Sequence, residues 1–211
     1  RAALSDGWGG SMIGTELSDI LFGVPEPHEV EANLGVLKEN EVNIVIHGHE
    51  PTLSEAILVA VNDPELTELA KEQGAEGINL VGMCCTGNEI AMRHNVPMAG
   101  NFFQQELAIV TGAVDAMVVD VQCIMPALSQ VAKCYHTKLI TTSPKAKIPG
   151  AIHMQFDEEK AIESAKKIVK EAVLNFKNRT GNILIPEVKS KGLVGFSNES
   201  IINALDGVTN S

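Results

Sequence analysis

Three short segments of this chain place histidine or cysteine directly after an apolar run. They are 42–46 followed by His47-Gly48-His49, 78–83 followed by Cys84-Cys85, and 116–121 followed by Gln122-Cys123. Imidazole and thiolate are the soft ligands that iron–sulfur clusters, zinc and copper prefer. Zinc-finger ligands usually come in pairs a few residues apart, whereas these are spread widely along the chain. The spacing is therefore not that of a zinc finger, and it is compatible with an iron–sulfur cluster or a mixed-metal cluster.

Each of these residues also has a plain structural explanation. A lone histidine or cysteine often serves only as a packed core residue, and Cys134 fits that role best because it follows Val131 on an expected helix. His49 lies further from its strand than His47, so we expect His49 to face the sheet edge and His47 to support it. In an extended backbone neighbouring side chains alternate, so only one of Cys84 and Cys85 is expected to face that edge.

The helix expected after Cys85 bears on the chemistry of the thiols. Thr86-Gly87-Asn88 reads as the start of a helix. The amide dipoles at a helix start lower the pKa of a nearby thiol and favour the thiolate that metals bind. Three strand ends that all carry such ligands make a shared metal site more plausible than any one residue does alone, and the candidates are His49, Cys85 and Cys123.

The elements that position these residues alternate between strands and helices. Strands are expected at 42–46, 78–82, 116–121 and 138–142, with amphipathic helices between them and a long helix over 158–177 that Asp157 caps. This alternation predicts an α/β fold, a doubly wound and mainly parallel sheet flanked by helices. Such a sheet carries its sites at the carboxyl ends of its strands. No phosphate-binding glycine motif follows any strand.

We expect three regions along the chain. Residues 1–39 form a helical segment with helices over 11–22 and 28–38, residues 40–178 form the α/β domain, and residues 179–211 form a less regular extension. Within the extension, edge strands are expected at 182–186 and 193–196, and a short helix at 200–205. The irregular ends suggest a piece of a longer polypeptide.

Composition excludes several classes of function. The 16 basic residues against 27 acidic ones give a formal charge of −11, which disfavours nucleic-acid binding. No apolar stretch is long enough to span a membrane, and the first residues do not read as a signal peptide. The four cysteines do not form a secretory disulfide framework, so we expect a reducing, cytoplasmic location.

The same three segments carry a family resemblance. The motifs are His47-Gly48-His49-Glu50-Pro51, Cys84-Cys85-Thr86-Gly87-Asn88-Glu89 and Val121-Gln122-Cys123-Ile124-Met125-Pro126. They resemble the nickel-dependent carbon monoxide dehydrogenases of anaerobes, most closely the subunit that partners acetyl-CoA synthase. The likeness covers most of the chain, which then corresponds to the Rossmann-like middle domain preceded by a short remnant of a helical domain.

The resemblance implies a nickel–iron–sulfur cluster and the reversible oxidation of CO with water to CO₂, two protons and two electrons. It assigns His49 and Cys85 to an iron outside the cage and Cys123 to an iron of the cage. It also implies an electron acceptor such as ferredoxin, a homodimer, and an acetyl-CoA synthase subunit as a possible partner. The remaining cluster ligands would lie outside this chain, so we expect the chain to be inactive alone. A hybrid-cluster-like redox domain and a metal-free structural or interaction domain are the alternatives.

Overall fold

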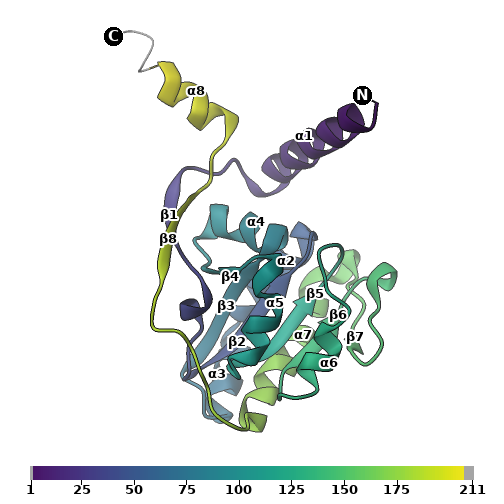
Figure 1. Ribbon diagram of the computed structural model, residues 1–211, viewed down its shortest axis with the longest axis vertical. Helices are drawn as coiled ribbons and strands as arrows, with labels where there is room; N and C mark the ends of the chain where they lie inside the picture. The colour runs from purple at the N-terminus through teal and green to yellow at the C-terminus, as the bar shows by residue number, and fades with distance from the viewer. Residues whose placement is uncertain (1, 207–211) are drawn as a thin grey trace.

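The computed structural model describes residues 2–206, and its centre is one eight-stranded sheet (Figure 1). The strand order is β7-β6-β5-β2-β3-β4-β1-β8, and every pair is parallel except β1 with β8. The strands are β1 (His28–Ala32), β2 (Glu41–His47), β3 (Gly77–Met83), β4 (Met98–Gly100), β5 (Val114–Val119), β6 (Lys138–Thr141), β7 (Ile152–His153) and β8 (Ser190–Val194).

Strand β2 lies where the order of the sheet reverses. From β2 the chain continues to β3 and β4 on one side, and then crosses over to β5, β6 and β7 on the other. The crevice beside such a reversal is where open α/β sheets build their sites. The arrangement confirms the predicted α/β, Rossmann-like doubly wound and mainly parallel sheet.

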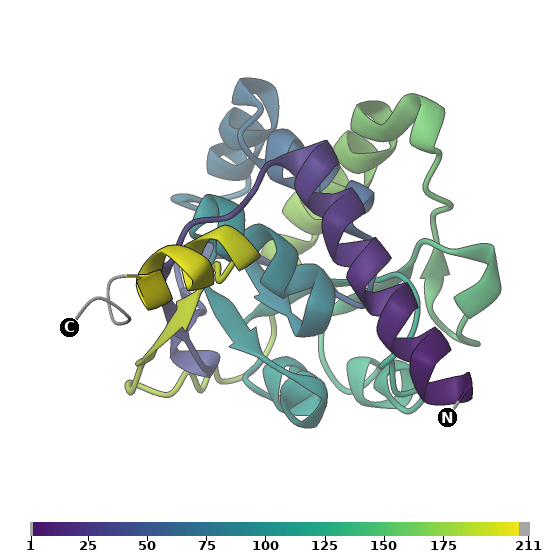
Figure 2. The same cartoon turned by 90° about the horizontal axis from the view of Figure 1, so that it is seen from above.

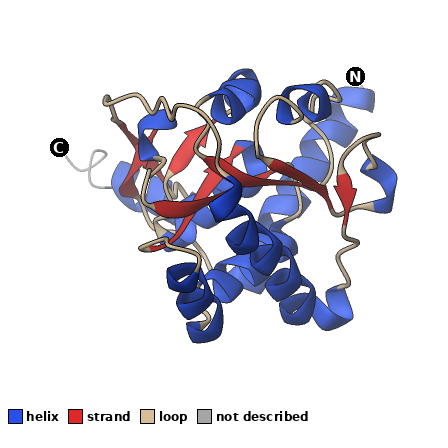
Figure 3. Cartoon of the chain, turned by 90° about the horizontal axis from the view of Figure 1, so that it is seen from below, coloured by secondary structure: helices blue, strands red, loops and turns tan. Residues whose placement is uncertain are grey.

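Helices cover both faces of this sheet, as the view along it shows (Figure 3). The helices are α1 (Ala2–Phe22), α2 (Pro51–Val61), α3 (Pro64–Glu72), α4 (Cys84–His94), α5 (Gln105–Val110), α6 (Leu128–Ala132), α7 (Ala161–Asn175) and α8 (Asn198–Asp206). Residues of α2, α3, α4 and α7 form one buried apolar cluster against the sheet, and residues of α5 and α6 contribute to a second.

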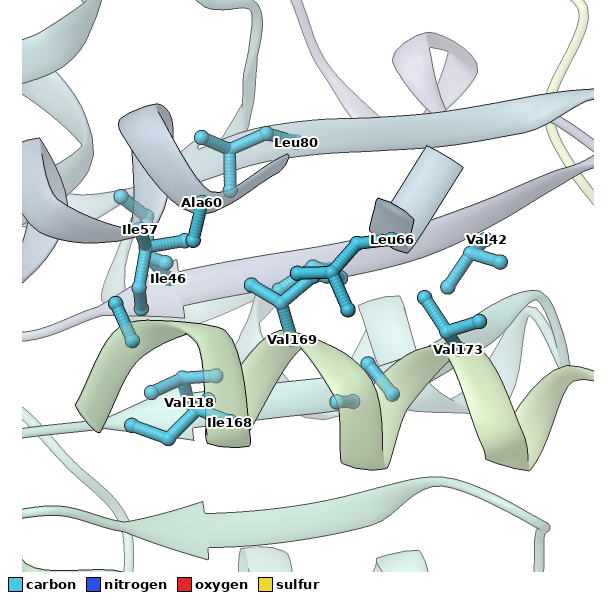
Figure 4. Close-up of a cluster of buried hydrophobic side chains, with 14 of the residues drawn as sticks. Val42, Ile46, Ile57, Ala60, Leu66, Leu80, Val118, Ile168, Val169 and Val173 are labelled. Carbon is cyan, nitrogen blue, oxygen red and sulfur yellow. The ribbon is translucent and has the colours of Figure 1, made fainter. Parts of the chain in front are cut away.

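Helix α7 shows how amphipathic spacing builds the first cluster. Ala165, Ile168, Val169, Ala172 and Val173 are all buried, at the three- and four-residue intervals that place side chains on one helix face. Figure 4 shows this face of α7 meeting side chains from β2 and α2. A turn of 3-10 helix over Glu158–Lys160 precedes α7, and the side chain of Asp157 caps that turn as predicted.

The region before β2 differs from expectation at residues 28–38. The helix predicted over 28–38 is wrong: residues 28–32 form β1, and a short 3-10 turn follows at Leu34–Val36. Only Val30 of β1 is buried; β1 pairs along its whole length with β8, about 160 residues away, and with β4 only at Ala32. Local spacing does not report such a distant partner, so the sequence pattern was misleading.

The segment after α7 is partly as predicted. The strand expected at 193–196 corresponds to β8 and the helix expected at 200–205 to α8, although residues 182–186 form no strand. Helices α1 and α8 extend from the same end of the molecule (Figures 1 and 2). The proposed division of the chain at residues 39 and 178 stays a prediction, and the sheet itself continues through β1 and β8 on either side. Among the described residues, no helix has the length and apolarity needed to cross a membrane.

Candidate metal centre

The three ligand-bearing segments leave the sheet from adjacent strands. His47, the last residue of β2, is in register with Met83 of β3 on one side and with Val119 of β5 on the other. Counted from these three aligned residues, His49 and Cys85 each lie two positions further along the chain, and Cys123 lies four positions further. The topology brings the three predicted residues to the same edge of the sheet, beside the point where its order reverses.

A buried carboxylate joins the three segments. Asp120, which is 1% exposed and directly follows β5, accepts hydrogen bonds from the amides of His49, Glu50 and Val121. It also accepts one from the hydroxyl of Thr86, at 2.9 Å, and Thr86 Oγ1 in turn accepts from the Glu50 amide at 2.7 Å. The Thr86 amide donates to Gly48 O at 2.8 Å. The backbone around each candidate ligand is thus held by the same small network.

Glycine at position 48 makes this approach possible. Gly48 has a φ of +134°, and a Cβ atom there would lie 1.7 Å from Asp120 Oδ1. Any larger residue would push the carboxylate out of reach of the amides.

A second close contact, between Gly82 and Gly87, lets α4 start directly against the end of β3, because a Cβ on Gly82 would lie 2.5 Å from Gly87 Cα.

Three residues at this edge have unusual backbone angles. Cys84, Gln122 and Cys123 have φ values of 57°, 59° and 50°, in the left-handed region that residues with a Cβ rarely adopt. Strained backbone of this kind concentrates at functional sites, where the surrounding structure over-determines it. The strain here coincides with two of the candidate thiol segments.

His47 is linked through Gln105 to the segment that carries Cys123. Its side chain is fully buried, and its Nε2 atom lies 3.1 Å from the Oε1 atom of Gln105, which also accepts the Met125 amide at 2.9 Å. The other end of the Gln105 amide donates to Cys123 O at 3.3 Å. Burial lowers the pKa of His47, which keeps its imidazole neutral. His47 thus lies inside, as predicted, while His49 is half-buried nearer the edge.

Cys84 and Cys85 lie in different environments, as predicted, although the backbone is not extended there, because α4 begins at Cys84, whose φ is 57°. Cys84 is half-buried against the apolar cluster that includes Met83, whereas Cys85 is exposed, as is Cys123. Burial, and after it charge repulsion from the nearby Cys123 and Cys85 thiolates, raises the pKa of Cys84 to about 11. Burial and then the Cys123 thiol also raise the pKa of Cys85.

These shifts correct one prediction and the exposure of Cys134 corrects another. We predicted that the start of α4 would lower the thiol pKa, and this is wrong because burial and neighbouring negative charges outweigh the helix dipole. Cys134 was predicted to be packed in the core. It is exposed, because α6 ends at Ala132 and Cys134 lies in the turn beyond it.

The imidazole and thiol donors are of the kind that an iron–sulfur or mixed-metal cluster needs, but they do not surround a single metal ion. Within residues 2–206, no three side chains of His, Cys, Asp or Glu converge closely enough to hold one metal ion. A cluster presents several metal atoms, so its ligands need not meet at one point. The Nδ1 atom of His49 is buried, with no hydrogen-bond partner in the part of the chain that the structure describes. An unpartnered imidazole nitrogen beside thiols is consistent with such a group.

Sequence reasoning missed the residues that hold the edge together, namely Gly48, Thr86, Gln105 and Asp120. From the sequence, Asp120 is expected only as part of the strand over 116–121. Asp120 could have been found from the sequence, because an acidic residue at the carboxyl end of a parallel strand lies where such sheets build their sites. Gln105 had no such signal, because its importance depends on a contact with His47, 58 positions away.

Comparison with known proteins agrees with this geometry. The Prismane/CO dehydrogenase family model matches residues 1–204. Carbon monoxide dehydrogenase 1 of Methanosarcina mazei is 62% identical over 208 residues, which cover 98% of this chain and 33% of that protein. Carbon monoxide dehydrogenase 1 of Carboxydothermus hydrogenoformans is 54% identical over 208 residues, which cover 97% of this chain and 32% of that protein.

Solved structures give the same result. A nickel-free carbon monoxide dehydrogenase from Thermococcus sp. AM4 superposes with a TM-score of 0.93 and 58% identity, covering 98% of this chain and 33% of that one. This chain therefore spans about a third of the length of the relatives it matches. The family model, the identities and the superposition together show that the chain belongs to the Prismane/CO dehydrogenase family.

Proposed function

We propose that this chain supplies His49, Cys85 and Cys123 as part of the ligand set of a nickel–iron–sulfur cluster in an anaerobic carbon monoxide dehydrogenase. The observation that carries the proposal is the position of these residues, which directly follow three adjacent strands at the reversal point of the sheet, in segments that one buried carboxylate links. The family includes proteins other than dehydrogenases. The identities of 54% and 62% to proteins named carbon monoxide dehydrogenase favour that branch.

In the proposed reaction, CO and H₂O give CO₂, two protons and two electrons, and the cluster supplies the redox chemistry when bound. The residues of this chain contribute position and environment. His49 offers an imidazole nitrogen that has no hydrogen-bond partner within residues 2–206. Cys85 and Cys123 offer exposed thiols, and the neutral His47 adds no positive charge beside them.

The proposed partners follow from the same assignment. The reaction releases two electrons, so the whole enzyme needs an acceptor, for which we propose a ferredoxin. A relative from Moorella thermoacetica, 51% identical, is named carbon monoxide dehydrogenase/acetyl-CoA synthase subunit beta, which supports an acetyl-CoA synthase subunit as a further partner. We also propose a homodimer in the cytoplasm, where free cysteines of this kind stay reduced.

The metal assignment is tested by anaerobic reconstitution of the chain with iron and sulfide, followed by metal analysis and visible absorption spectroscopy. We expect bound iron with a broad visible band, and loss of that iron in His49→Ala, Cys85→Ser and Cys123→Ser. The matched control is Cys134→Ser, because Cys134 is also exposed but lies outside the strand edge. Zinc alone, or equal iron in all variants, would contradict the assignment.

We expect the isolated chain to show no CO oxidation. It spans about a third of its relatives, so the ligands supplied elsewhere in those proteins are not on this chain. A dye-linked CO oxidation assay on the reconstituted chain measures this directly, with a full-length relative as the positive control. Turnover by the chain alone would show that the proposed ligand set is already complete here.

A further inference from the structure

We propose that Asp120 is a positioning residue that sets the spacing of the three ligand-bearing segments before any metal arrives. The proposal deepens the metal-centre function proposed above and rests on it. Asp120 itself belongs to the segment that leads to Cys123. Its carboxylate holds the segment of His49 through two amides and the segment of Cys85 through Thr86.

The direction of each hydrogen bond requires a carboxylate at this position. Backbone amides can only donate, and they reach both oxygens: His49 and Val121 donate to Oδ1, and Glu50 donates to Oδ2. Thr86 Oγ1 accepts from the Glu50 amide, so its own proton points to Oδ2. All four partners are donors. An amide side chain would turn an NH₂ group toward one set of them.

The location of Asp120 gives this network a firm base. Strand β5 is buried along its whole length and pairs with both β2 and β6. The Asp120 amide donates to His47 O at 3.2 Å, so the backbone of Asp120 is tied to the end of β2 as well. A ligand set held in place by supporting hydrogen bonds loses less entropy when it binds metal.

A second buried aspartate on the same strand provides a matched control. Asp115 lies near the start of β5, is fully buried, and accepts from the side chains of Arg179 and His136 and from the Asn43 amide. It is as well hydrogen-bonded as Asp120 but lies at the opposite end of the strand. Asp115→Asn therefore reports the cost of disturbing a buried carboxylate in β5 without touching the proposed metal site.

The first test uses hydrogen exchange in the metal-free chain. In Asp120→Asn we expect the amides of His49, Glu50 and Val121 to exchange at least about tenfold faster than in the unmodified chain. In Asp115→Asn those amides should keep their rates relative to the rest of the sheet, while the Asn43 amide accelerates. Unchanged rates at residues 49, 50 and 121 in Asp120→Asn would overturn the positioning role, whatever metal the chain binds.

The second test measures iron affinity after anaerobic reconstitution, with thermal stability measured alongside. Asp120→Asn should weaken iron binding by roughly 10- to 100-fold, the usual effect of removing a supporting hydrogen-bond partner. Asp115→Asn should lose thermal stability but keep its iron. Equal loss of iron in both variants would assign Asp120 a purely structural role. If the unmodified chain binds no iron, the metal-centre function fails, and the exchange result still decides whether Asp120 positions the edge.

A milder pair of variants covers the case in which Asp120→Asn does not fold. Thr86→Val removes one hydroxyl from the network and keeps the shape of the side chain, whereas Thr86→Ser keeps the hydroxyl. We expect faster exchange at the Glu50 amide and weaker iron binding in Thr86→Val, and recovery of both in Thr86→Ser. Identical behaviour of the two variants would contradict the proposal.

Discussion

The edge of this sheet depends on a few residues whose size matters more than their chemistry. Gly48 is one of them, because its missing side chain leaves the space that the Asp120 carboxylate occupies. The backbone at Cys84 and Cys123 is strained, with φ values of 57° and 50°. The role of Gly48 is plain in the structure and has no signal in the sequence, where a glycine between two histidines has many explanations.

Gly48→Ala should destabilise the chain by at least about 2 kcal/mol, because the new methyl group would overlap Asp120 and the φ of +134° is strained for alanine. Chemical denaturation measures the change. Gly74→Ala is the control: Gly74 also has a positive φ, +91°, but a Cβ there meets nothing within 4 Å. We expect that variant to lose only about 1 kcal/mol. Equal losses would show that the contact with Asp120 is relieved cheaply.

The four thiols should differ in their rates of alkylation. Cys84 is half-buried with a pKa raised to about 11, so at pH 8 only about one thiol in a thousand is ionised. We expect iodoacetamide to modify the exposed Cys123 and Cys134 first, Cys85 later because its pKa is raised, and Cys84 last. Mass spectrometry of peptides from the metal-free chain under anaerobic conditions gives the order. Early modification of Cys84 would contradict the burial described above.

At the scale of elements, α7 supplies much of the cluster that backs the sheet. Ile168→Ala should cost about 2 to 5 kcal/mol, because Ile168 is only 1% exposed and its removal leaves a cavity. Ile162 lies on the same helix, directly after its first residue, and is 42% exposed. Ile162→Ala should therefore change the free energy of unfolding by about 0.5 kcal/mol or less. Similar losses in the two variants would place Ile162 in the core.

Elements with their own periodicity were predictable, and elements defined by a distant partner were not. The strands β2, β3 and β5 and the helix α7 carry clear apolar patterns, and the structure confirms each of them to within a few residues. Strand β1 was misread as a helix because its pairing with β8 decides its conformation. Residues 182–186 show the opposite error: Ile183 and Ile185 pack on the core, and the Leu184 amide donates to Thr111 O, without any strand pairing.

The same distinction applies to the site. Strand ends and ligand types pointed to His49, Cys85 and Cys123, and the topology brings their segments together. The network that holds them joins residues up to 71 positions apart, such as His49 and Asp120. No local pattern encodes a contact of this range, so the supporting residues emerged only from the fold.

For the molecule as a whole, Arg179 fastens the segment after α7 to the opposite end of the sheet from the candidate site. It donates to both oxygens of Asp115 and to the carbonyls of Glu39 and Glu41, while its guanidinium lies 4.2 Å from the Phe176 ring centre. Arg179 is 10% exposed at its side chain and Asp115 is not exposed at all. This ion pair connects three separate parts of the chain.

Arg179→Met should destabilise the chain by about 3 to 5 kcal/mol, because it leaves the Asp115 carboxylate buried without its ionic partner. Lys191→Met is the control: Lys191 pairs with Glu29 at 2.7 Å, but both side chains are largely exposed. Its loss should leave the stability of the chain almost unchanged, because solvent screens the pair. Denaturant titrations of both variants measure the difference, and a small loss in Arg179→Met would show that the Asp115 network rearranges.

The position of β2 between β3 and β5 also sets an order of events during synthesis. As the chain leaves the ribosome, β2 emerges first and β3 next, so β2 can pair on one side while its other side waits for β5. Asp120 and Cys123 follow β5 directly. The edge that carries His49 is therefore complete only once the residues that follow β5, from Asp120 to Cys123, have been translated. The three candidate ligand segments can come together only after that point.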